Sequence, residues 1–178
     1  MILSVALHYF VFAWGLFGRI GGEPKKVDLA GDGSILPPFT LLNLIGEPVK
    51  SEAFQGKVIL LDFWATWCPP CREELPALNE LHRKYKKDGL MVIGISLDHG
   101  AEGVQKFIAR AGVDYLNLMA EDAVIERFNR IPGLSPIHKI PIKLLIDRRG
   151  RIHKQFVGFT SPKPLEEEIA EILKKTDT

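Results

Sequence analysis

The sequence predicts an α/β fold in which helices flank a central mixed β-sheet. Two observations carry the prediction: strand and helix patterns alternate from residue 39 onward, and a short turn at 148–150 joins the last two strand patterns. Alternation implies parallel strands joined by crossover helices, whereas a tight turn joins antiparallel neighbours. At 178 residues and 46% hydrophobic, the chain can bury one sizeable core, so one domain with extensions is expected.

Two segments precede this domain. Residues 1–17 contain no charged side chain, which is typical of a secretory segment or a membrane anchor. A secretory segment usually opens with basic residues, and a spanning helix needs about 20 apolar residues, so a helix packed on the domain stays as a third interpretation. We expect export or anchoring. Residues 18–36 are rich in glycine, proline and charge, which predicts a linker, and the domain is expected at 37–178.

The first half of the domain contains a strand and a helix on either side of a cysteine pair. Residues 57–64 form a continuous apolar run, partly β-branched, as expected of a strand buried on both faces. Leucines at helical spacing then predict a helix over 73–87, whose basic end suits a helix C-terminus. Before this pair, residues 39–44 have a strand pattern and residues 51–54 a short helical one.

The second half repeats the alternation and ends with a hairpin. Apolar runs predict strands over 90–96, 115–118, 142–147 and 152–157. Helices are predicted over 101–110, 122–128 and 162–175.

Charge and cysteine content exclude several classes of function. The net charge of +1 lacks the basic excess of a dedicated nucleic-acid-binding protein. The only cysteines, Cys68 and Cys71, are three apart, whereas a structural disulfide framework needs several spaced cysteines. A zinc site would need two further ligands, and the five histidines are scattered, so no metal is expected.

The position of the cysteine pair predicts its chemistry. A C-x-x-C motif after a buried strand places Cys68 at a helix N-terminus, where free N–H groups and the helix dipole favour an anion. The thiolate is the nucleophile, so we expect Cys68 to attack and Cys71, one turn further on, to resolve the mixed disulfide. Pro69 and Pro70 offer no N–H or cation to the Cys68 thiolate, which predicts a reductant rather than a strong oxidant.

The active-site segment identifies a family resemblance. The chain reads Asp62-Phe-Trp-Ala-Thr-Trp-Cys-Pro-Pro-Cys-Arg-Glu-Glu-Leu-Pro76, which resembles the TlpA/ResA-like thiol-disulfide oxidoreductases of the thioredoxin fold. The likeness covers about residues 36–173 and includes the phrase Pro38-Phe39-Thr40-Leu41, the start of the central strand at 56–58, and Gly158. It implies a thioredoxin-like three-layer fold and a redox-active disulfide with no other cofactor.

The resemblance also implies supporting residues for proton transfer. Asp62 matches the buried carboxylate of thioredoxin, and a desolvated acid with a raised pKa suits a proton relay to Cys71. Many TlpA-like proteins have asparagine there, so this chain departs toward thioredoxin. Glu74 matches a family glutamate near the cysteines, although an ordinary solvated helix residue remains the alternative.

A substrate groove is implied around the same motif. Pro141 matches the family's cis-proline, and the exposed backbone of Ile140 before it can pair with an extended client. Pro132 and Pro136 are rival candidates, but neither directly begins a strand. Trp67, Pro69 and Pro70 complete the expected groove. Ile142 and Lys143 replace the residues usual in the family, which leaves client preference open.

These observations predict a reductase of protein disulfides. The resemblance implies an extracytoplasmic location, clients such as an apocytochrome c during cytochrome c biogenesis, and an upstream thiol electron donor. A peroxiredoxin-like peroxidase is the alternative, weakened because the residues before Cys68 do not match the usual peroxidatic pattern Pro-x-x-x-Thr/Ser-x-x-Cys. A binding or chaperone module with a structural or metal-binding C-x-x-C is the third interpretation, and the sequence supplies no further ligands for it.

Overall fold

The computed structural model describes residues 25–28 and 33–175. The apolar segment 1–17 lies outside these residues, and its role as an export or anchoring segment stays a prediction. Among the described residues, no helix combines the length and the apolar character needed to cross a membrane.

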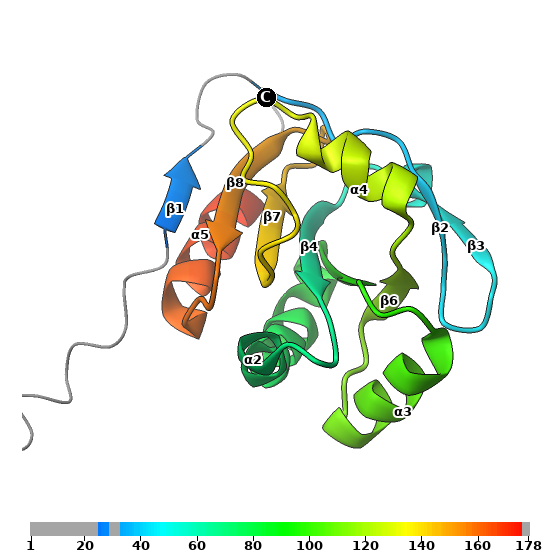
Figure 1. The fold of residues 1–178 in the computed structure, drawn as a ribbon. Coiled ribbons are helices and arrows are strands. Elements are labelled where there is room, and N and C mark those ends of the chain that lie inside the picture. Colours follow the sequence, from blue (N-terminus) through cyan, green and yellow to red (C-terminus); the bar gives the residue numbers. More distant parts are fainter. Residues whose placement is uncertain (1–24, 29–32, 176–178) are drawn as a thin grey trace, which may run out of the picture.

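A six-stranded mixed sheet forms the middle layer of the domain (Figure 1). Its order is β1-β8-β7-β4-β5-β6; β4, β5 and β6 are parallel, whereas β7 is antiparallel to both of its neighbours and β1 is antiparallel to β8. The strands are β1 (Lys25–Asp28), β4 (Val58–Trp64), β5 (Leu90–Ser96), β6 (Leu116–Met119), β7 (Ile142–Ile146) and β8 (Ile152–Val157). A separate hairpin pairs β2 (Thr40–Leu42) with β3 (Pro48–Lys50).

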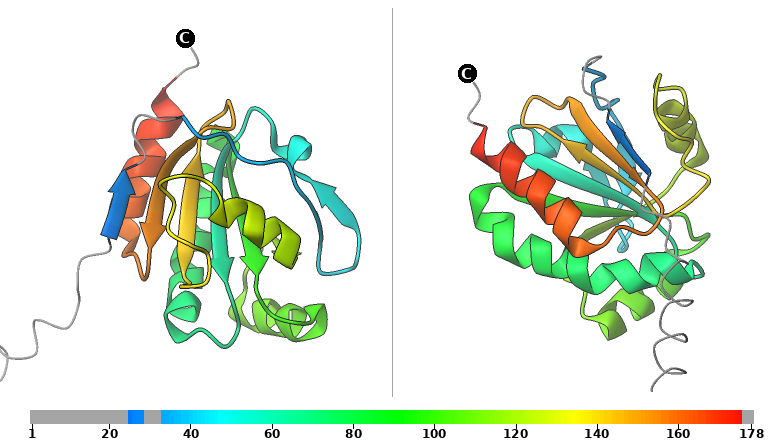
Figure 2. Two further views of the ribbon diagram at one scale, coloured as in Figure 1. Left: turned by 45° about the horizontal axis from the view of Figure 1, so that its top comes forward. Right: turned by 90° about the vertical axis from the view of Figure 1, so that its left-hand side faces the viewer.

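Helices cover both faces of this sheet (Figure 2). The helices α2 (Pro69–Tyr85), α3 (Ala101–Ala111) and α5 (Pro162–Lys174) contribute to one apolar cluster, and α4 (Asp122–Asn129) contributes to the other. Two short 3-10 helices, η1 (Ser51–Phe54) and η2 (Lys86–Asp88), precede β4 and β5. The chain therefore forms the three layers that the sequence predicted.

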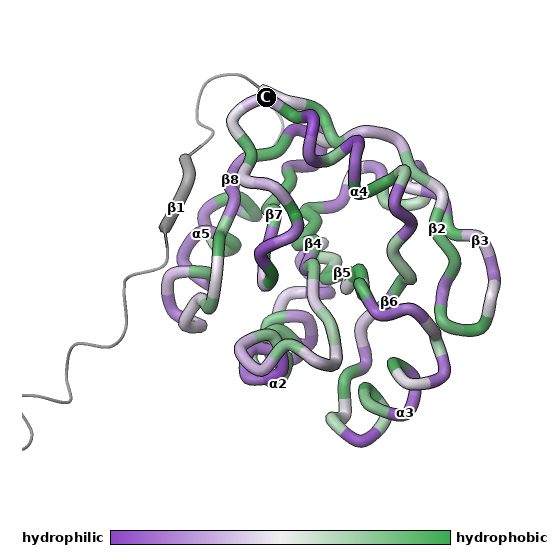
Figure 3. The backbone as a smooth tube through the Cα atoms, in the orientation of Figure 1, coloured by the Kyte–Doolittle hydropathy of each residue, from purple (hydrophilic) through white to green (hydrophobic). Residues whose placement is uncertain are grey.

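Side chains alternate along the central strand β4 and supply both halves of the core. Leu60 and Trp64 pack in the cluster that includes α2, whereas Leu61 and Phe63 pack in the cluster that includes α4. Green, apolar stretches accordingly lie along β4 in Figure 3. Because side chains alternate along a strand, Asp62 lies on the α2 face, where the residue is 1% exposed.

The predicted elements from residue 39 onward are confirmed, with small shifts at their ends. Helix α2 begins at Pro69, directly after Cys68, and runs unbroken past Pro76 to Tyr85. The structure differs in the stretch predicted as a linker, where residues 25–28 form the edge strand β1 against β8. The outer edge of β8 offers backbone N–H and C=O groups to β1, and pairing with these groups needs an extended backbone rather than a particular side-chain pattern. Periodicity therefore could not predict this strand.

Gly94 in β5 lies where only a residue without a side chain fits. Trp64 Nε1 donates a hydrogen bond to Asn117 Oδ1 at 3.0 Å. A Cβ atom on Gly94 would overlap that oxygen and come within 2.8 Å of Trp64 Nε1. We expect Gly94→Ala to lower the free energy of unfolding by about 2 kcal/mol, because the core must shift and the buried hydrogen bond is lost. Urea denaturation would measure this.

Gly103→Ala is the matched control. Gly103 lies within α3, and a Cβ atom there would meet no atom within 4 Å. Alanine is a better helix former, so this variant should be as stable as the wild type or slightly more stable. Equal stability of the two alanine variants would contradict the close-packing argument at Gly94.

Candidate functional site

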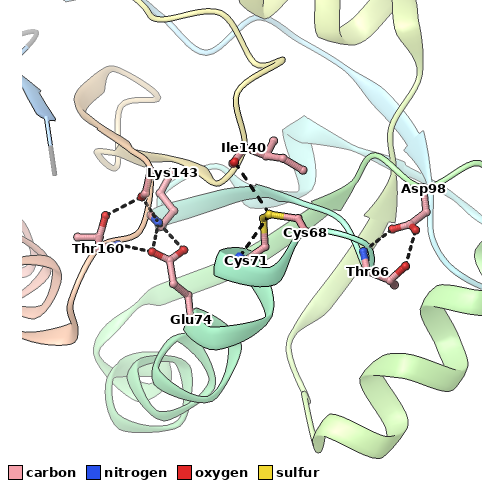
Figure 4. Close-up of a disulfide and its surroundings, with 9 residues drawn as sticks. Thr66, Cys68, Cys71, Glu74, Asp98, Ile140, Lys143 and Thr160 are labelled. Atoms are coloured by element: carbon pink, nitrogen blue, oxygen red, sulfur yellow. Dashed lines mark hydrogen bonds and ion pairs between the residues drawn. A yellow bond between two sulfur atoms is a disulfide. The ribbon is translucent and has the colours of Figure 1, made fainter. Parts of the chain in front are cut away.

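The cysteine pair lies at the start of α2. Cys68 and Cys71 form a disulfide with an S–S distance of 2.03 Å, and Cys68 occupies the N-cap position of the helix. The backbone N–H of Cys71 donates to Cys68 Sγ at 3.3 Å (Figure 4). Pro69 and Pro70 occupy the first helical turn, where a missing N–H leaves no intrahelical bond unmade. Cys71 thus supplies a helix N-terminal donor to the predicted nucleophilic sulfur.

The cis-proline loop faces this sulfur. The Ile140–Pro141 peptide bond is cis, and no other cis bond occurs in the part of the chain that the structure describes. Ile140 O lies 4.0 Å from Cys68 Sγ. In the disulfide neither sulfur carries a proton, so this is a close approach, but a Cys68 thiol has a proton to donate there. The Pro141 carbonyl accepts a hydrogen bond from Gly158 N at 2.8 Å, which joins the loop to the end of β8.

Two exposed aromatic side chains flank these elements. Trp67, directly before Cys68, is 63% exposed, and Phe159, directly after Gly158, is 46% exposed. Large exposed apolar side chains are a feature of surfaces that bind other molecules. Trp67 was predicted as part of the groove, whereas Phe159 was not singled out, because a single phenylalanine between a strand and a helix carries no pattern.

A cluster of buried charged groups joins α2 to β7, where Glu74 follows Cys71 by three residues. Lys143 Nζ is 2.6 Å from Glu74 Oε1 and 2.5 Å from Glu74 Oε2, and it donates to the Gly158 carbonyl at 3.2 Å (Figure 4). Glu74 Oε1 also accepts a hydrogen bond from the backbone N–H of Thr160. Lys143 is fully buried and Glu74 is 3% exposed. The interpretation of Glu74 as a solvated helix residue is therefore excluded.

Asp62 belongs to the same cluster. It is the register partner of Lys143 across β4 and β7, so the two side chains lie side by side on the α2 face. Burial raises the pKa of Asp62 to about 7; Lys143 opposes the rise and Glu74 adds to it. Burial also raises the pKa of Glu74, opposed by its ion pair with Lys143 and the Thr160 N–H. Asp62 is thus a carboxyl group able to exchange a proton near neutral pH.

Asp98 holds the loop that leads into the motif. Its carboxylate accepts hydrogen bonds from Thr66 N at 2.9 Å and Thr66 Oγ1 at 2.6 Å (Figure 4). It also accepts one from Ser96 Oγ at 2.7 Å. These bonds join the end of β5 to the residues just before Cys68. Asp98 was not among the predicted site residues, because an aspartate after a strand is common and its partner Thr66 lies 32 residues away in sequence.

The predicted site residues lie on β4, at the start of α2 and on the loop before β7, where Ile140 O approaches Cys68 Sγ. The set comprises Asp62, Trp67, Cys68, Pro69, Pro70, Cys71, Glu74, Ile140 and Pro141. Lys143 was not predicted as a member, although a lysine inside an apolar strand, two residues after the expected cis-proline, was a usable signal. Within residues 25–28 and 33–175, no group of three or more His, Cys, Asp or Glu residues is arranged to hold a metal ion.

Comparison with known proteins identifies relatives over most of the chain. The family model described as AhpC/TSA family matches residues 33–170. The thiol-disulfide oxidoreductase ResA of Bacillus thuringiensis is 30% identical over 166 residues, covering 93% of this chain and 88% of the relative. ResA of Geobacillus thermodenitrificans is 29% identical over 172 residues, covering 97% of this chain and 91% of that protein.

Solved structures show the same fold. A thiol:disulfide interchange protein of the thioredoxin family from Chlorobium tepidum is 28% identical with a TM-score of 0.72, and the match covers 80% of this chain and 98% of that one. The thioredoxin domain of a thiol-disulfide oxidoreductase from Bacteroides vulgatus is 25% identical with a TM-score of 0.67, over 80% and 97% of the two chains. With its C-x-x-C disulfide at the helix N-terminus, this chain belongs to the AhpC/TSA family and, within it, to the ResA-like thiol-disulfide oxidoreductases of the thioredoxin fold.

Proposed function

We propose that this protein reduces protein disulfides, with Cys68 as the nucleophile and Cys71 as the resolving thiol. The observation that carries the proposal is the Cys68–Cys71 disulfide at the N-terminus of α2, opposite the cis Ile140–Pro141 bond. A helix N-terminus stabilises a thiolate, and the backbone beside the cis-proline offers a pairing edge to an extended client.

The reaction begins with the dithiol form. The Cys68 thiolate attacks one sulfur of a client disulfide, which forms a mixed disulfide and releases the other client sulfur as a thiolate. Cys71 then loses its proton and attacks Cys68 Sγ. The Cys68–Cys71 bond forms, the bond to the client breaks, and the second client sulfur leaves as a thiolate that is protonated by solvent. The client gains two electrons, which an upstream dithiol donor must restore to Cys68 and Cys71.

Asp62 is the proposed acceptor of the Cys71 proton. Its pKa of about 7 means that a substantial share of the carboxyl groups is ionised at neutral pH and ready to accept a proton. Cys71 is 1% exposed, so direct transfer to bulk water is hindered. Proton transfer through a buried carboxyl would allow the resolving step to proceed without solvent at the sulfur.

The Pro-Pro pair supports reduction as the physiological direction. A disulfide is strongly oxidising when its thiolate form is well stabilised. Within the motif the donor to Cys68 Sγ is the N–H of Cys71, because Pro69 and Pro70 have none. Fewer donors stabilise the thiolate less, which favours the disulfide and makes the dithiol the better reductant.

The equilibrium redox potential of the Cys68/Cys71 couple tests this proposal. Titration of the purified protein in a dithiothreitol series should give a value near that of thioredoxin, about −270 mV. The dithiol form should also reduce a model protein disulfide. A value near −120 mV, typical of a strong disulfide donor, would contradict the reductase direction.

The peroxidase alternative is not favoured. The two ResA relatives described above are thiol-disulfide oxidoreductases, and the residues before Cys68 do not match the peroxidatic pattern. We expect negligible consumption of hydrogen peroxide compared with disulfide reduction in a side-by-side assay.

We further propose an extracytoplasmic location, with residues 1–17 as the export or anchoring segment. Residues 25–28, which the sequence predicted as part of a linker, belong to the sheet of the domain. The proposal is supported by the uncharged character of residues 1–17. An apocytochrome c and an upstream thiol electron donor are the proposed partners. Protease accessibility in intact cells and extraction with alkaline carbonate would distinguish an exported, an anchored and a cytoplasmic protein.

A further inference from the structure

The buried ion pair of Lys143 and Glu74 is unusual for its place in the fold. Lys143 lies in β7 between apolar residues and is fully buried, yet each of its three possible hydrogen bonds is made: two to Glu74 and one to the Gly158 carbonyl. Burying two charges is costly unless such bonds are complete. The ion pair with Lys143 and the hydrogen bond from Thr160 N–H therefore favour the ionised form of Glu74.

Asp62 has a different environment in the same cluster. Among the described residues, its Oδ1 has no hydrogen-bond partner. Across the sheet on the other side it faces Gly94, which brings no side chain. The three N–H donors of Lys143 are thus used by Glu74 and the Gly158 carbonyl. The positive charge of Lys143 therefore acts on Asp62 without a hydrogen bond between the two side chains. Two carboxyl groups share one cation, so the less well solvated of them holds its proton to higher pH.

We propose that Lys143 is a positioning residue of the redox site: by pairing with Glu74 it keeps that carboxylate charged and fixed, and it leaves Asp62 as the carboxyl that exchanges a proton with Cys71. The exchange with Cys71 rests on the proposed function, whereas the division of roles between the carboxyl groups does not. Glu74 acts here as a fixed charge rather than as the proton acceptor.

The charged and titratable groups that interact with Asp62 come from three elements: Lys143 from β7, Glu74 from α2 and Tyr115 from the loop before β6. Burial, with smaller contributions from Asp62 and Glu74, raises the pKa of Tyr115 well above its usual value, so it stays protonated. Asp62 is therefore the member of the cluster that is expected to change charge near neutral pH in the disulfide form.

Carbon-13 NMR of the side-chain carboxyl groups in the oxidised full-length protein tests the division directly. The Asp62 resonance should titrate near pH 7, and the Glu74 resonance should stay at the ionised position through that interval. Titration of Glu74 near pH 7 with Asp62 unchanged would overturn the proposal. This readout does not depend on catalytic activity, so it remains informative even if the protein fails to reduce any disulfide tested.

Lys143→Met tests the role of the cation. Without it, Asp62 and Glu74 repel each other without compensation, and the Asp62 midpoint should rise by at least about one pH unit. The midpoint of the pH profile for disulfide reduction should rise with it. An unchanged Asp62 midpoint would overturn the positioning role, and a shifted Asp62 midpoint with an unchanged reduction profile would overturn the exchange with Cys71.

Lys154→Met is the matched control. Lys154 also forms a largely buried pair, with its Nζ 2.5 Å from Glu168 Oε1, but this pair joins β8 to α5 outside the cluster. Lys154→Met should lose a comparable amount of stability but leave the Asp62 midpoint and the midpoint of the reduction profile unchanged. If it shifted them as much as Lys143→Met does, general destabilisation would explain the shifts and the proposal would be overturned.

A double variant covers the case in which Lys143→Met does not fold. Lys143→Met combined with Glu74→Gln removes both charges of the ion pair, so neither partner is left as an unpaired buried ion. Because Lys143 lowers the pKa of Asp62 more than Glu74 raises it, the Asp62 midpoint should still lie above that of the wild type. A midpoint at or below the wild-type value would overturn the proposal.

Discussion

Cys68→Ser is expected to reduce the rate of protein disulfide reduction to that of the uncatalysed reaction, a loss of at least about 10³-fold. Serine presents a hydroxyl group that is not ionised at neutral pH, so no nucleophile remains at the N-cap of α2. The measurement is the initial rate of reduction of a model protein disulfide in the presence of dithiothreitol, with the variant at the same concentration as the wild type.

Cys71→Ser is the matched variant, because it also removes the disulfide but leaves the nucleophile. It should still attack an aromatic disulfide reagent and should then accumulate as a mixed disulfide at Cys68, which intact-mass spectrometry detects. Cys68→Ser should form no such adduct at a comparable rate. If Cys68→Ser formed the adduct and Cys71→Ser did not, the roles assigned to the two sulfurs would be reversed.

Asp62→Asn is expected to stabilise the oxidised protein at pH 8 by up to about 4 kcal/mol, which corresponds to the interval between the ordinary pKa of 3.8 and the folded-state value of about 7. The folded state holds the Asp62 proton more tightly than the unfolded state. The wild type therefore loses stability as the pH rises from about 4 to about 7, whereas a neutral amide does not. Urea denaturation at pH 4, 6 and 8 measures the difference.

The stabilities of the two proteins should nearly converge at pH 4, where Asp62 is protonated when folded and partly protonated when unfolded. The same substitution should slow disulfide reduction at neutral pH and remove the titration near pH 7 from its pH profile, since the proposed acceptor is gone. If Asp62→Asn and the wild type had the same stability at pH 8 as well as at pH 4, a raised pKa at this position would be contradicted.

Asp147→Asn provides a control of opposite sign. Burial would raise the pKa of Asp147, but hydrogen bonds from Arg151 and from the Arg149 backbone hold it below its usual value. An acid with a lowered pKa contributes stability above its unfolded value and loses that contribution as the pH falls through the folded value. Asp147→Asn should therefore be less stable than the wild type at pH 8, and the deficit should shrink in acid.

Local patterns in the sequence were sufficient to predict most of the fold and the reacting sulfurs. The continuous apolar run of β4 reports burial on both faces, and the leucine spacing after Cys71 reports one apolar face of α2. The C-x-x-C spacing between these elements places two sulfurs within one helical turn. Each of these features depends on neighbours along the chain, so the sequence alone determined them.

The charged cluster was decided by the tertiary structure. Asp62 and Lys143 lie side by side only because β4 and β7 pair antiparallel in one particular register, and a slip by one residue would turn Lys143 to the opposite face. Glu74 meets Lys143 across 69 residues of sequence, and Asp98 meets Thr66 across 32. Strand β1 similarly forms by pairing with the outer edge of β8, which is distant in sequence. Such contacts are set by packing and register between distant segments, and no periodicity within either segment contains them.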